Sequence, residues 1–393
     1  MFFSRRKIMK KYSKEELENI YLDRKMKLVD YMTNNKIDAA VFEDTEERRN
    51  PAVRYFTGHP SDALYIIAVV DGKATDFLVP WDENLANEKS IGVQILPYNK
   101  YERKNTTAVS KILKSLKIKG NKKVEIPPET PYPLFLKYVD ALSAIGWDVL
   151  CRDKSIHDFV VEMRATKDEY EIECTKEAAR VGDHIISEIE RGIRENWLHK
   201  EMDVALLIES ELRKCGCERT GFDTLAAGPA RSWAIHAFPG YTDAPWPADG
   251  LSILDFGVVY EGYTSDTTLT VAKNLNEKQA ELVELVEQAA KESLPLYKPG
   301  SKIKLAGEKA DEVFAKAKRV MPHTLGHGIG LEIHEFPRIS SKQDEKAVFK
   351  PGMIVTLEPG LYDPKLGGVR LENDVLITKD GNEVITHSKI IRI

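Results

Sequence analysis

Two aspartates lie in segments whose composition is typical of β-strands. Asp255 belongs to the apolar run 251–259, and Asp266 belongs to the Thr-rich run 262–270. A short turn between these runs would pair them as a β-hairpin. Aspartate is disfavoured inside strands, and like charges that face each other across a hairpin repel. A bound cation, such as a metal ion, would offset this repulsion.

The register of the hairpin depends on the centre of its turn. A turn centred on Tyr260 and Glu261 places the two aspartates directly opposite each other. A turn centred on Glu261 and Gly262 makes them diagonal neighbours and places Thr268 opposite Asp255. Both registers bring the carboxylates close together. For a lone aspartate, a solvent-exposed position near the turn is an equally good interpretation, so the rest of the chain must decide.

Three further residues could bind the same cation. His327 lies between Gly326 and Gly328, and glycines allow the backbone to approach a site closely. Glu358 and Glu372 lie at the end of, or inside, apolar segments that are typical of strands. With the two aspartates they make a set of two Asp, two Glu and one His. Such an oxygen-rich set suits two hard or borderline divalent ions held a few ångströms apart.

These five residues, in this order, resemble the ligand set of the creatinase, aminopeptidase P and prolidase metallopeptidases, which share the "pita-bread" fold. The segment 163–172 (Met-Arg-Ala-Thr-Lys-Asp-Glu-Tyr-Glu-Ile) is similar to the one that opens the catalytic domain of Xaa-Pro peptidases. The segment 50–58 resembles, more loosely, part of the family's N-terminal domain. The resemblance implies an α/β (α+β) chain with a creatinase-like domain over residues 1–153 and a pita-bread catalytic domain over 154–393.

The resemblance also implies a cofactor of two divalent metal ions per chain. Asp255 would bind one ion through both oxygens, while Asp266 and Glu372 would bridge the two ions. His327 and Glu358 would complete the coordination of the second ion. Mn²⁺ is the first choice, and Co²⁺, Zn²⁺ and Fe²⁺ also accept such ligands.

Catalytic and substrate-binding roles follow from the same resemblance. His236 and His334 match two active-site histidines of the family, and with Glu358 they form the expected catalytic group. His236 and His334 would also contact the substrate, together with Arg338, which would bind the carboxylate of a dipeptide. For Arg338, a plain surface position is an equally open interpretation. For His323 the sequence leaves the role open between a part in the site and a structural one.

Residues around this group either match the family or depart from it. Arg370, Tyr362 and Thr268 match partners whose hydrogen bonds orient ligating carboxylates. Leu269 stands where the family commonly has arginine, and the residues at 231–233 (Arg-Ser-Trp) replace smaller and amide residues before His236. These departures bear on the side chain of the substrate more than on the chemistry.

Hydrophobic periodicity predicts the elements that must position these residues. In the first part, a helix follows the capping box Ser13–Glu16, and helices alternate with short strands. The later part begins with successive helices and continues with strands rich in Asp, Gly and Thr. The predicted elements are strand 37–42, the hairpin 63–79 around Asp71-Gly72, helices 105–117 and 134–144, strands 124–126 and 148–150, helices over 156–213, the hairpin above, helices 276–294 and 301–318, and Gly-rich strands to the end.

Composition limits the other function classes. The 393 residues are 42% hydrophobic and 30% charged, with a net charge of −5, as expected for a globular chain with two cores. Without a basic excess, neither nucleic acid nor a membrane surface is an expected partner. No apolar run approaches the roughly 20 residues that span a bilayer. The four cysteines are expected to be reduced thiols in a cytoplasmic protein.

The predicted function is hydrolysis of an Xaa-Pro peptide bond by a hydroxide that bridges two metal ions. The substrate would be a small peptide with proline at its second position, cleaved by a dipeptidase or an aminopeptidase P, and the resemblance suggests a homodimer. One alternative keeps the site but cleaves a non-peptide amide or amidine C–N bond, as in the creatinase and ectoine hydrolase branches. A non-catalytic binding protein is a further alternative, against which the complete ligand set argues.

Overall fold

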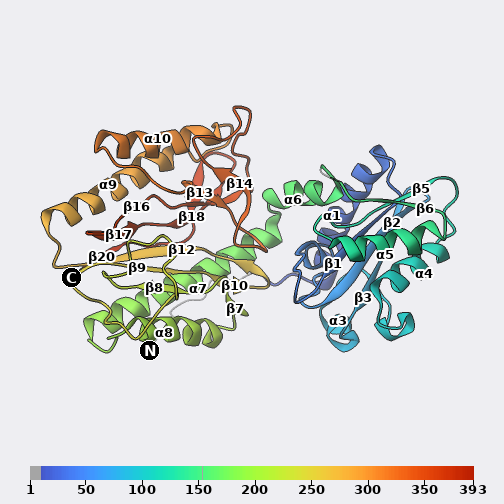
Figure 1. Ribbon diagram of the computed structural model, residues 1–393, viewed down its shortest axis with the longest axis horizontal. Helices are drawn as coiled ribbons and strands as arrows, with labels where there is room; N and C mark the ends of the chain where they lie inside the picture. The colour runs from blue at the N-terminus through green and yellow to red at the C-terminus, as the bar shows by residue number, and fades with distance from the viewer. Residues whose placement is uncertain (1–9, 153) are drawn as a thin grey trace. The chain divides into compact units, whose positions relative to one another are not determined.

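The computed structural model describes residues 10–152 and 154–393. Its mixture of helices and strands confirms the α/β (α+β) class that the sequence predicts (Figure 1). Within these residues, no helix is both long enough and apolar enough to cross a membrane. All four cysteines are free thiols.

The chain divides into two compact units between Met163 and Arg164. This point lies inside helix α6 (Ile156–Ala165). The sequence places the boundary earlier, at residue 153, because the composition changes there. Helix α6 thus begins in the first unit and ends in the second.

The first unit is built around one mixed six-stranded sheet with the order β4-β3-β2-β1-β5-β6. Helices α4 and α5 pack their apolar side chains on one face of this sheet, and α1 and α2 pack against the other face. The elements are α1 (Lys14–Asn34), β1 (Ala39–Asp44), α2 (Ala52–Thr57), β2 (Ala63–Val70), β3 (Lys73–Pro80), α3 (Glu83–Lys89), β4 (Gln94–Ile95), the 3₁₀ helix η1 (Tyr98–Tyr101), α4 (Asn105–Ser115), β5 (Lys122–Glu125), α5 (Tyr132–Ser143) and β6 (Trp147–Leu150).

Local signals account for much of this unit. Ser13 and Glu16 form the predicted capping box at the start of α1. Strands β2 and β3 pair around Asp71 and Gly72, which both have positive φ angles (50° and 73°), as tight hairpin turns require. The short helices α2 and α3 were not predicted, because six or seven residues are too few to show helical periodicity.

The second unit contains several sheets and four long helices among its described residues. Its larger sheets have the orders β20-β12-β9-β8 and β14-β13-β15-β18-β19. The elements are α7 (Glu169–Arg194), α8 (Glu201–Lys214), β7 (Arg219–Thr220), β8 (Leu225–Ala227), β9 (Gly250–Phe256), β10 (Val258–Tyr260), β11 (Tyr263–Thr264), β12 (Thr267–Lys273), α9 (Glu277–Ser293), the 3₁₀ helix η2 (Leu294–Leu296), α10 (Ile303–Lys316), β13 (Gly326–Gly328), β14 (Glu335–Ile339), β15 (Ile354–Leu357), β16 (Gly360–Asp363), β17 (Gly367–Arg370), β18 (Asn373–Ile377), β19 (Asn382–Val384) and β20 (Ile390–Arg392).

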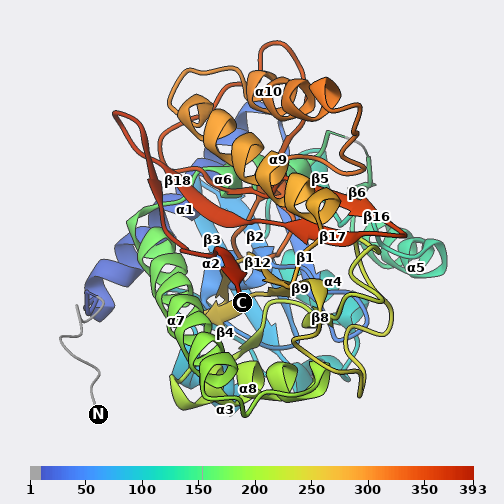
Figure 2. The ribbon, with the colours of Figure 1, turned by 90° about the vertical axis from the view of Figure 1, so that its left-hand side faces the viewer.

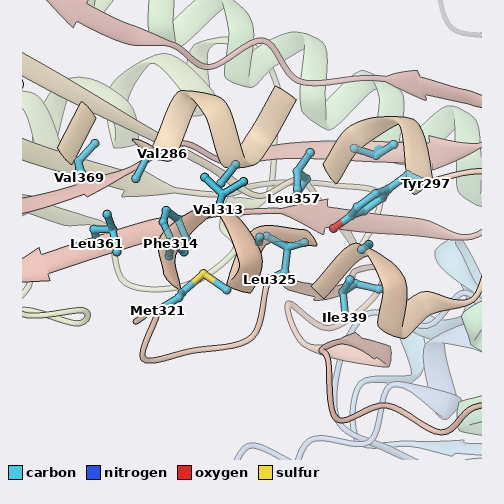
Figure 3. Close-up of a cluster of buried hydrophobic side chains, with 14 of the residues drawn as sticks. Val286, Tyr297, Val313, Phe314, Met321, Leu325, Ile339, Leu357, Leu361 and Val369 are labelled. Carbon is cyan, nitrogen blue, oxygen red and sulfur yellow. The ribbon is translucent and has the colours of Figure 1, made fainter. Parts of the chain in front are cut away.

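The helices of the second unit cover its strands from two sides. Helices α7 and α8 lie on one side of the strands, and α9 and α10 lie on the other (Figures 1 and 2). A large apolar core fills the space between α9, α10 and the strands, as Figure 3 shows. Side chains in this core include Val286, Val313, Phe314, Leu357, Leu361 and Val369. The strands are thus held from both sides, and their ends can carry polar residues in fixed positions.

Candidate metal centre

The hairpin that carries the two aspartates adopts the second of the two possible registers. Its turn is centred on Glu261 and Gly262, which have φ angles of 48° and 87°. Thr268 of β12 therefore pairs with Asp255 of β9, and Asp266 lies just before β12 as a diagonal neighbour. Both carboxylates are buried.

His327 reaches this pair from β13, where both neighbouring glycines are required. A side-chain carbon on Gly326 would clash with the Thr356 carbonyl, and one on Gly328 would clash with the Phe336 carbonyl. The sequence predicts that these glycines let the backbone come close to the cation site. In the structure they instead let β13 come close to the neighbouring strands. The imidazole Nδ1 lies 3.1 Å from the Gly328 carbonyl oxygen, so it donates there. This contact leaves Nε2 free to act as a ligand.

The two glutamates lie directly beside strands. Glu358 follows β15, and its Oε1 is 3.4 Å from His327 Nε2. Glu372 lies between β17 and β18, where Thr268 holds it twice. The Glu372 N–H donates to the Thr268 carbonyl oxygen (3.1 Å), and the Thr268 hydroxyl donates to Glu372 Oε2 (2.5 Å).

The structure brings all five predicted ligands to the wall of one cavity. One ligand atom each from Asp266, His327 and Glu372 lies within 4.8 Å of the other two. His327 Nε2 is 3.6 Å from Asp266 Oδ2.

Burial and mutual repulsion disfavour ionisation of these acids. Burial first, and then the charges of Glu372 and Asp255, raise the pKa of Asp266 well above its usual range. Burial raises the pKa of Glu358 to about 8, although Arg370 opposes this shift. Burial, reinforced by Glu358, likewise raises the pKa of Glu372. Carboxylates in such surroundings require protons or cations to neutralise them.

The residues fit divalent metal ions. Asp255 Oδ1 is buried and has no hydrogen-bond partner among the described residues, so a ligand-binding oxygen is left over. Burial lowers the pKa of His327 to about 4, so its imidazole is neutral at physiological pH, as a metal ligand must be. Four carboxylates and one neutral imidazole can neutralise two divalent charges.

Arg370, at the end of β17, holds this side of the site together. Its guanidinium pairs with Asp255 and donates from Nε to Thr268 Oγ1 (2.9 Å). Its Nη1 donates to the Tyr362 hydroxyl (2.7 Å) and to the Ile235 carbonyl oxygen (3.2 Å). Burial raises the pKa of Tyr362 to about 12, so the phenol stays neutral. The three residues predicted to orient ligands are therefore joined in one network.

The cavity has a volume of about 890 Å³ and also contains the predicted substrate-binding residues. The His334 ring packs edge-on against the His327 ring, with centroids 4.4 Å apart. His236 lies in the loop between β8 and β9, and Arg338 belongs to β14. The Arg338 guanidinium makes no ion pair with the residues that the structure describes, so it remains available to an anionic group.

The structure adds three polar residues to the site. Two of them, Asp374 and Thr356, are not predicted from the sequence. Asp374 Oδ2 accepts the backbone N–H of Asp266 (2.9 Å), and the Thr356 hydroxyl accepts the backbone N–H of His327 (3.1 Å). Asp374 could have been found, because it lies two residues after Glu372 and so shares its strand face. His323, whose role the sequence leaves open, lines the cavity and has Nε2 3.0 Å from the Tyr362 hydroxyl.

Of the four aromatic side chains of the segment 233–246, one lies in the cavity lining. Phe238 lines the cavity and is 96% exposed. Trp246 is fully buried in the core beside α7 and α8. Trp233 and Tyr241 do not line the cavity.

Comparison with known families accounts for this arrangement. A model of metallopeptidase family M24 matches residues 173–379, more than half of the chain. The chain belongs to metallopeptidase family M24. A second model, for the creatinase/prolidase N-terminal domain, matches residues 24–146. Both parts of the predicted resemblance are therefore confirmed, and membership of family M24 implies bound divalent metal ions.

Individual relatives cover nearly the whole chain. The Xaa-Pro dipeptidase of Pyrococcus horikoshii is 32% identical over 92% of this chain and 96% of its own. The Xaa-Pro dipeptidase of Pyrococcus furiosus is 33% identical over 93% of this chain and 98% of its own. Among solved structures, the prolidase from Pyrococcus horikoshii has a TM-score of 0.79 at 30% identity and covers 94% of this chain and 99% of its own. The X-Pro aminopeptidase from Thermotoga maritima has a TM-score of 0.77 at 27% identity and covers 91% of this chain and 98% of its own.

Proposed function

We propose that this M24 metallopeptidase is an Xaa-Pro dipeptidase that uses two divalent metal ions. The observation that carries the proposal is a single cavity with the five candidate ligands on its wall and the unpaired guanidinium of Arg338 in its lining. A dipeptide carries its carboxylate only one residue beyond the bond to be cleaved. The dipeptidase relatives, similar over more than nine-tenths of the chain, support this choice.

Asp255, Asp266, His327, Glu358 and Glu372 would hold the two ions. When bound, such ions lower the pKa of a water molecule and polarise the carbonyl of the bond to be cleaved. The chain's own residues would then move protons and bind the substrate. Among the possible ions we propose Mn²⁺, since four of the five ligands are carboxylates.

Glu358 would act as the general base. Its carboxylate lies between His327 and His323, with Oε1 3.4 Å from His327 Nε2 and Oε2 3.9 Å from His323 Nδ1. It would accept the proton of the attacking water and pass it to the proline nitrogen as the bond breaks.

His236 and His334 would hydrogen-bond the oxygen on which negative charge develops, or the carboxylate of the substrate. Burial and the neighbouring charges of His236 and Arg338 lower the pKa of His334, so it would donate as a neutral imidazole. Hydrogen-bond donors that already point to the place where negative charge develops need not be reoriented during the reaction, which lowers its barrier. Arg338 would bind the C-terminal carboxylate through charge-assisted hydrogen bonds.

The proposal is tested by comparing three substrates on the metal-loaded protein: an Xaa-Pro dipeptide, the same dipeptide with an amidated C-terminus, and an Xaa-Pro-Xaa tripeptide. A dipeptidase releases proline from the first and cleaves the other two poorly. Equal or faster cleavage of the tripeptide would instead favour an aminopeptidase P, a second candidate that the Thermotoga maritima structure supports. Failure to cleave any peptide would favour a non-peptide amide or amidine substrate.

Three further proposals concern the state of the protein. We propose a homodimer, which size-exclusion chromatography with light scattering would test. We propose a cytoplasmic location, in keeping with four free thiols, which would be tested by cell fractionation. We propose a domain boundary after residue 153, which limited proteolysis would test.

A further inference from the structure

The loop that carries His236 is tied to a buried glutamate outside the metal centre. Glu201 is the first residue of α8, and its side chain is fully buried. A buried carboxylate is costly unless hydrogen bonds and positive charge compensate it. Its partners therefore indicate what it stabilises.

Among the described residues, every side-chain partner of Glu201 belongs to the segment 228–242, here called the His236 loop. At one end of the loop, the Gly228 N–H donates to Glu201 Oε1 (2.7 Å). At the other end, the Thr242 N–H (2.7 Å) and hydroxyl (2.6 Å) donate to Oε2. Arg231 Nη1 donates to the same oxygen (2.7 Å). One carboxylate thus joins both ends of the loop to α8.

The loop is fixed at two further points. The other terminal nitrogen of Arg231 donates to the Pro239 carbonyl oxygen, which joins the two halves of the loop. Arg370 Nη1 donates to the carbonyl oxygen of Ile235, directly before His236. Glu201 thus fixes the base of the loop, Arg231 joins its two halves, and Arg370 holds the residue next to His236.

We infer that Glu201 is a positioning residue that acts through His236. Its carboxylate holds the base of the His236 loop, and Arg231 extends this support across the loop to the segment that carries Phe238. The inference also accounts for Arg231, which departs from the family pattern: a planar guanidinium can donate to Glu201 and Pro239 at once. The effect on catalysis rests on the proposed function, whereas the anchoring of the loop does not.

Kinetics test the link between Glu201 and His236. The substitution Glu201→Gln keeps the volume but removes the charge that pairs with Arg231. Because displacement of a contact group by about 1 Å can cost about a hundredfold, we expect kcat/KM for an Xaa-Pro dipeptide to fall tenfold to a hundredfold. In a His236→Ala background the same change should cost less than about twofold, since the group that Glu201 positions is absent. An equal loss in both backgrounds, or no loss, would overturn the inference.

The control is Glu209→Gln, the same substitution on the exposed side of the same helix, where Glu209 pairs with Arg213. It should leave kcat/KM unchanged in both backgrounds. If Glu201→Gln does not fold, Arg231→Met removes the contacts to Glu201 and Pro239 and should show the same dependence on His236. An equal loss with and without His236 would again overturn the inference.

Hydrogen exchange tests the anchoring without any substrate. In the Glu201→Gln protein, amides of residues 228–242 should exchange at least tenfold faster than in the wild type, while those of β9 and β12 should not change. If the wild type cleaves no Xaa-Pro peptide but this selective change occurs, the proposed function fails and the anchor stands. Unchanged exchange in the loop would overturn the anchor, even if the wild type is a dipeptidase.

Discussion

At the scale of single residues, the candidate metal centre combines the imidazole of His327 with four acids that only cations or protons can neutralise. Asp255 lies within β9, the other three acids lie beside strand ends, and Thr268 and Arg370 hold Glu372 and Asp255 by hydrogen bonds. The ligand types could be predicted from the sequence because acids are rare inside strands. Thr356 and Glu201 were harder to find, since the segments that they hold, at His327 and at 228–242, are distant in sequence.

Replacing Glu358 by Gln should lower kcat far more than it changes KM. The amide cannot accept the proton of the attacking water, and general acid–base catalysis is typically worth about 10² to 10⁴-fold. Steady-state kinetics at equal metal content would measure this effect. Glu312→Gln, at an exposed glutamate of α10, is the control. Near-normal turnover in a metal-loaded Glu358→Gln protein would remove Glu358 from the catalytic group.

Replacing Arg338 by Ala should weaken cleavage of dipeptides with a free carboxylate only. Loss of a charge-assisted hydrogen bond costs about 1.5 to 3 kcal/mol, or roughly tenfold to a hundredfold in kcat/KM. The amidated dipeptide should be a poor substrate of the wild type and of the Arg338→Ala protein, with similar kcat/KM values for the two. Arg213→Ala, at an exposed arginine of α8, should change neither rate by more than about twofold. Equal losses on the free and amidated dipeptides would show that Arg338 does not bind the carboxylate.

At the scale of elements, periodicity predicts which segments are strands, but turn geometry decides how they pair. Both registers of the Asp255 hairpin satisfy the apolar pattern, and the positive φ angles at Glu261 and Gly262 select one. Gly257 lies between β9 and β10. This position requires glycine, because a side chain there would clash with the Ser265 carbonyl. The association of β13, β15 and β18 into one sheet depends on long-range contacts, which local signals do not show.

A buried ion-pair cluster joins the start of the second unit to β14. Glu335 pairs with Arg164 and with Lys167 (3.1 Å), and all three side chains are buried. Burial opposes ionisation of Glu335, but the two cations outweigh it and lower its pKa to about 2, from an ordinary value of 4.5. The folded protein therefore binds fewer protons here than the unfolded chain. Its contribution to stability is present above about pH 4.5 and is lost as the pH falls towards 2.

Glu335→Gln should remove this pH dependence. In the wild type, the lowered pKa of Glu335 contributes about 2 kcal/mol less to the free energy of unfolding at pH 3 than at pH 6. The variant should be less stable by about 3 to 5 kcal/mol at pH 6, since two cations are left buried, but its stability should fall less on acidification. Urea unfolding at both pH values measures the difference, with Glu281→Gln, at an exposed glutamate of α9, as the control. The same acid dependence in wild type and Glu335→Gln would contradict the cluster's role.

At the scale of the whole molecule, composition predicts two cores, and the family resemblance predicts their order. The division between Met163 and Arg164 could not be located from the sequence, because helix α6 continues through it. Only the second unit contains the five candidate ligands. Metal binding should therefore raise the stability of the second unit.

Removing metal by a chelator should lower the melting temperature of the second unit by about 5 to 10 °C. An ion present at a hundredfold excess over its Kd stabilises the folded state by about 2.7 kcal/mol, and a unit of this size shifts by roughly 2 to 4 °C per kcal/mol. Calorimetry should show one transition that responds to metal and one that does not. Asp266→Ala should abolish the response, because the family resemblance implies that Asp266 contacts both ions. A shift of the same size in Asp266→Ala would place the metal elsewhere.

The most direct test of the account is a titration of chelator-stripped protein with Mn²⁺, in which bound metal and release of proline from an Xaa-Pro dipeptide are measured in the same samples. We predict that turnover rises with bound metal and reaches its plateau near two ions per chain, and that Asp266→Ala binds neither ion and releases no proline. Full turnover by the stripped protein, or stoichiometric metal with no proline released, would contradict it.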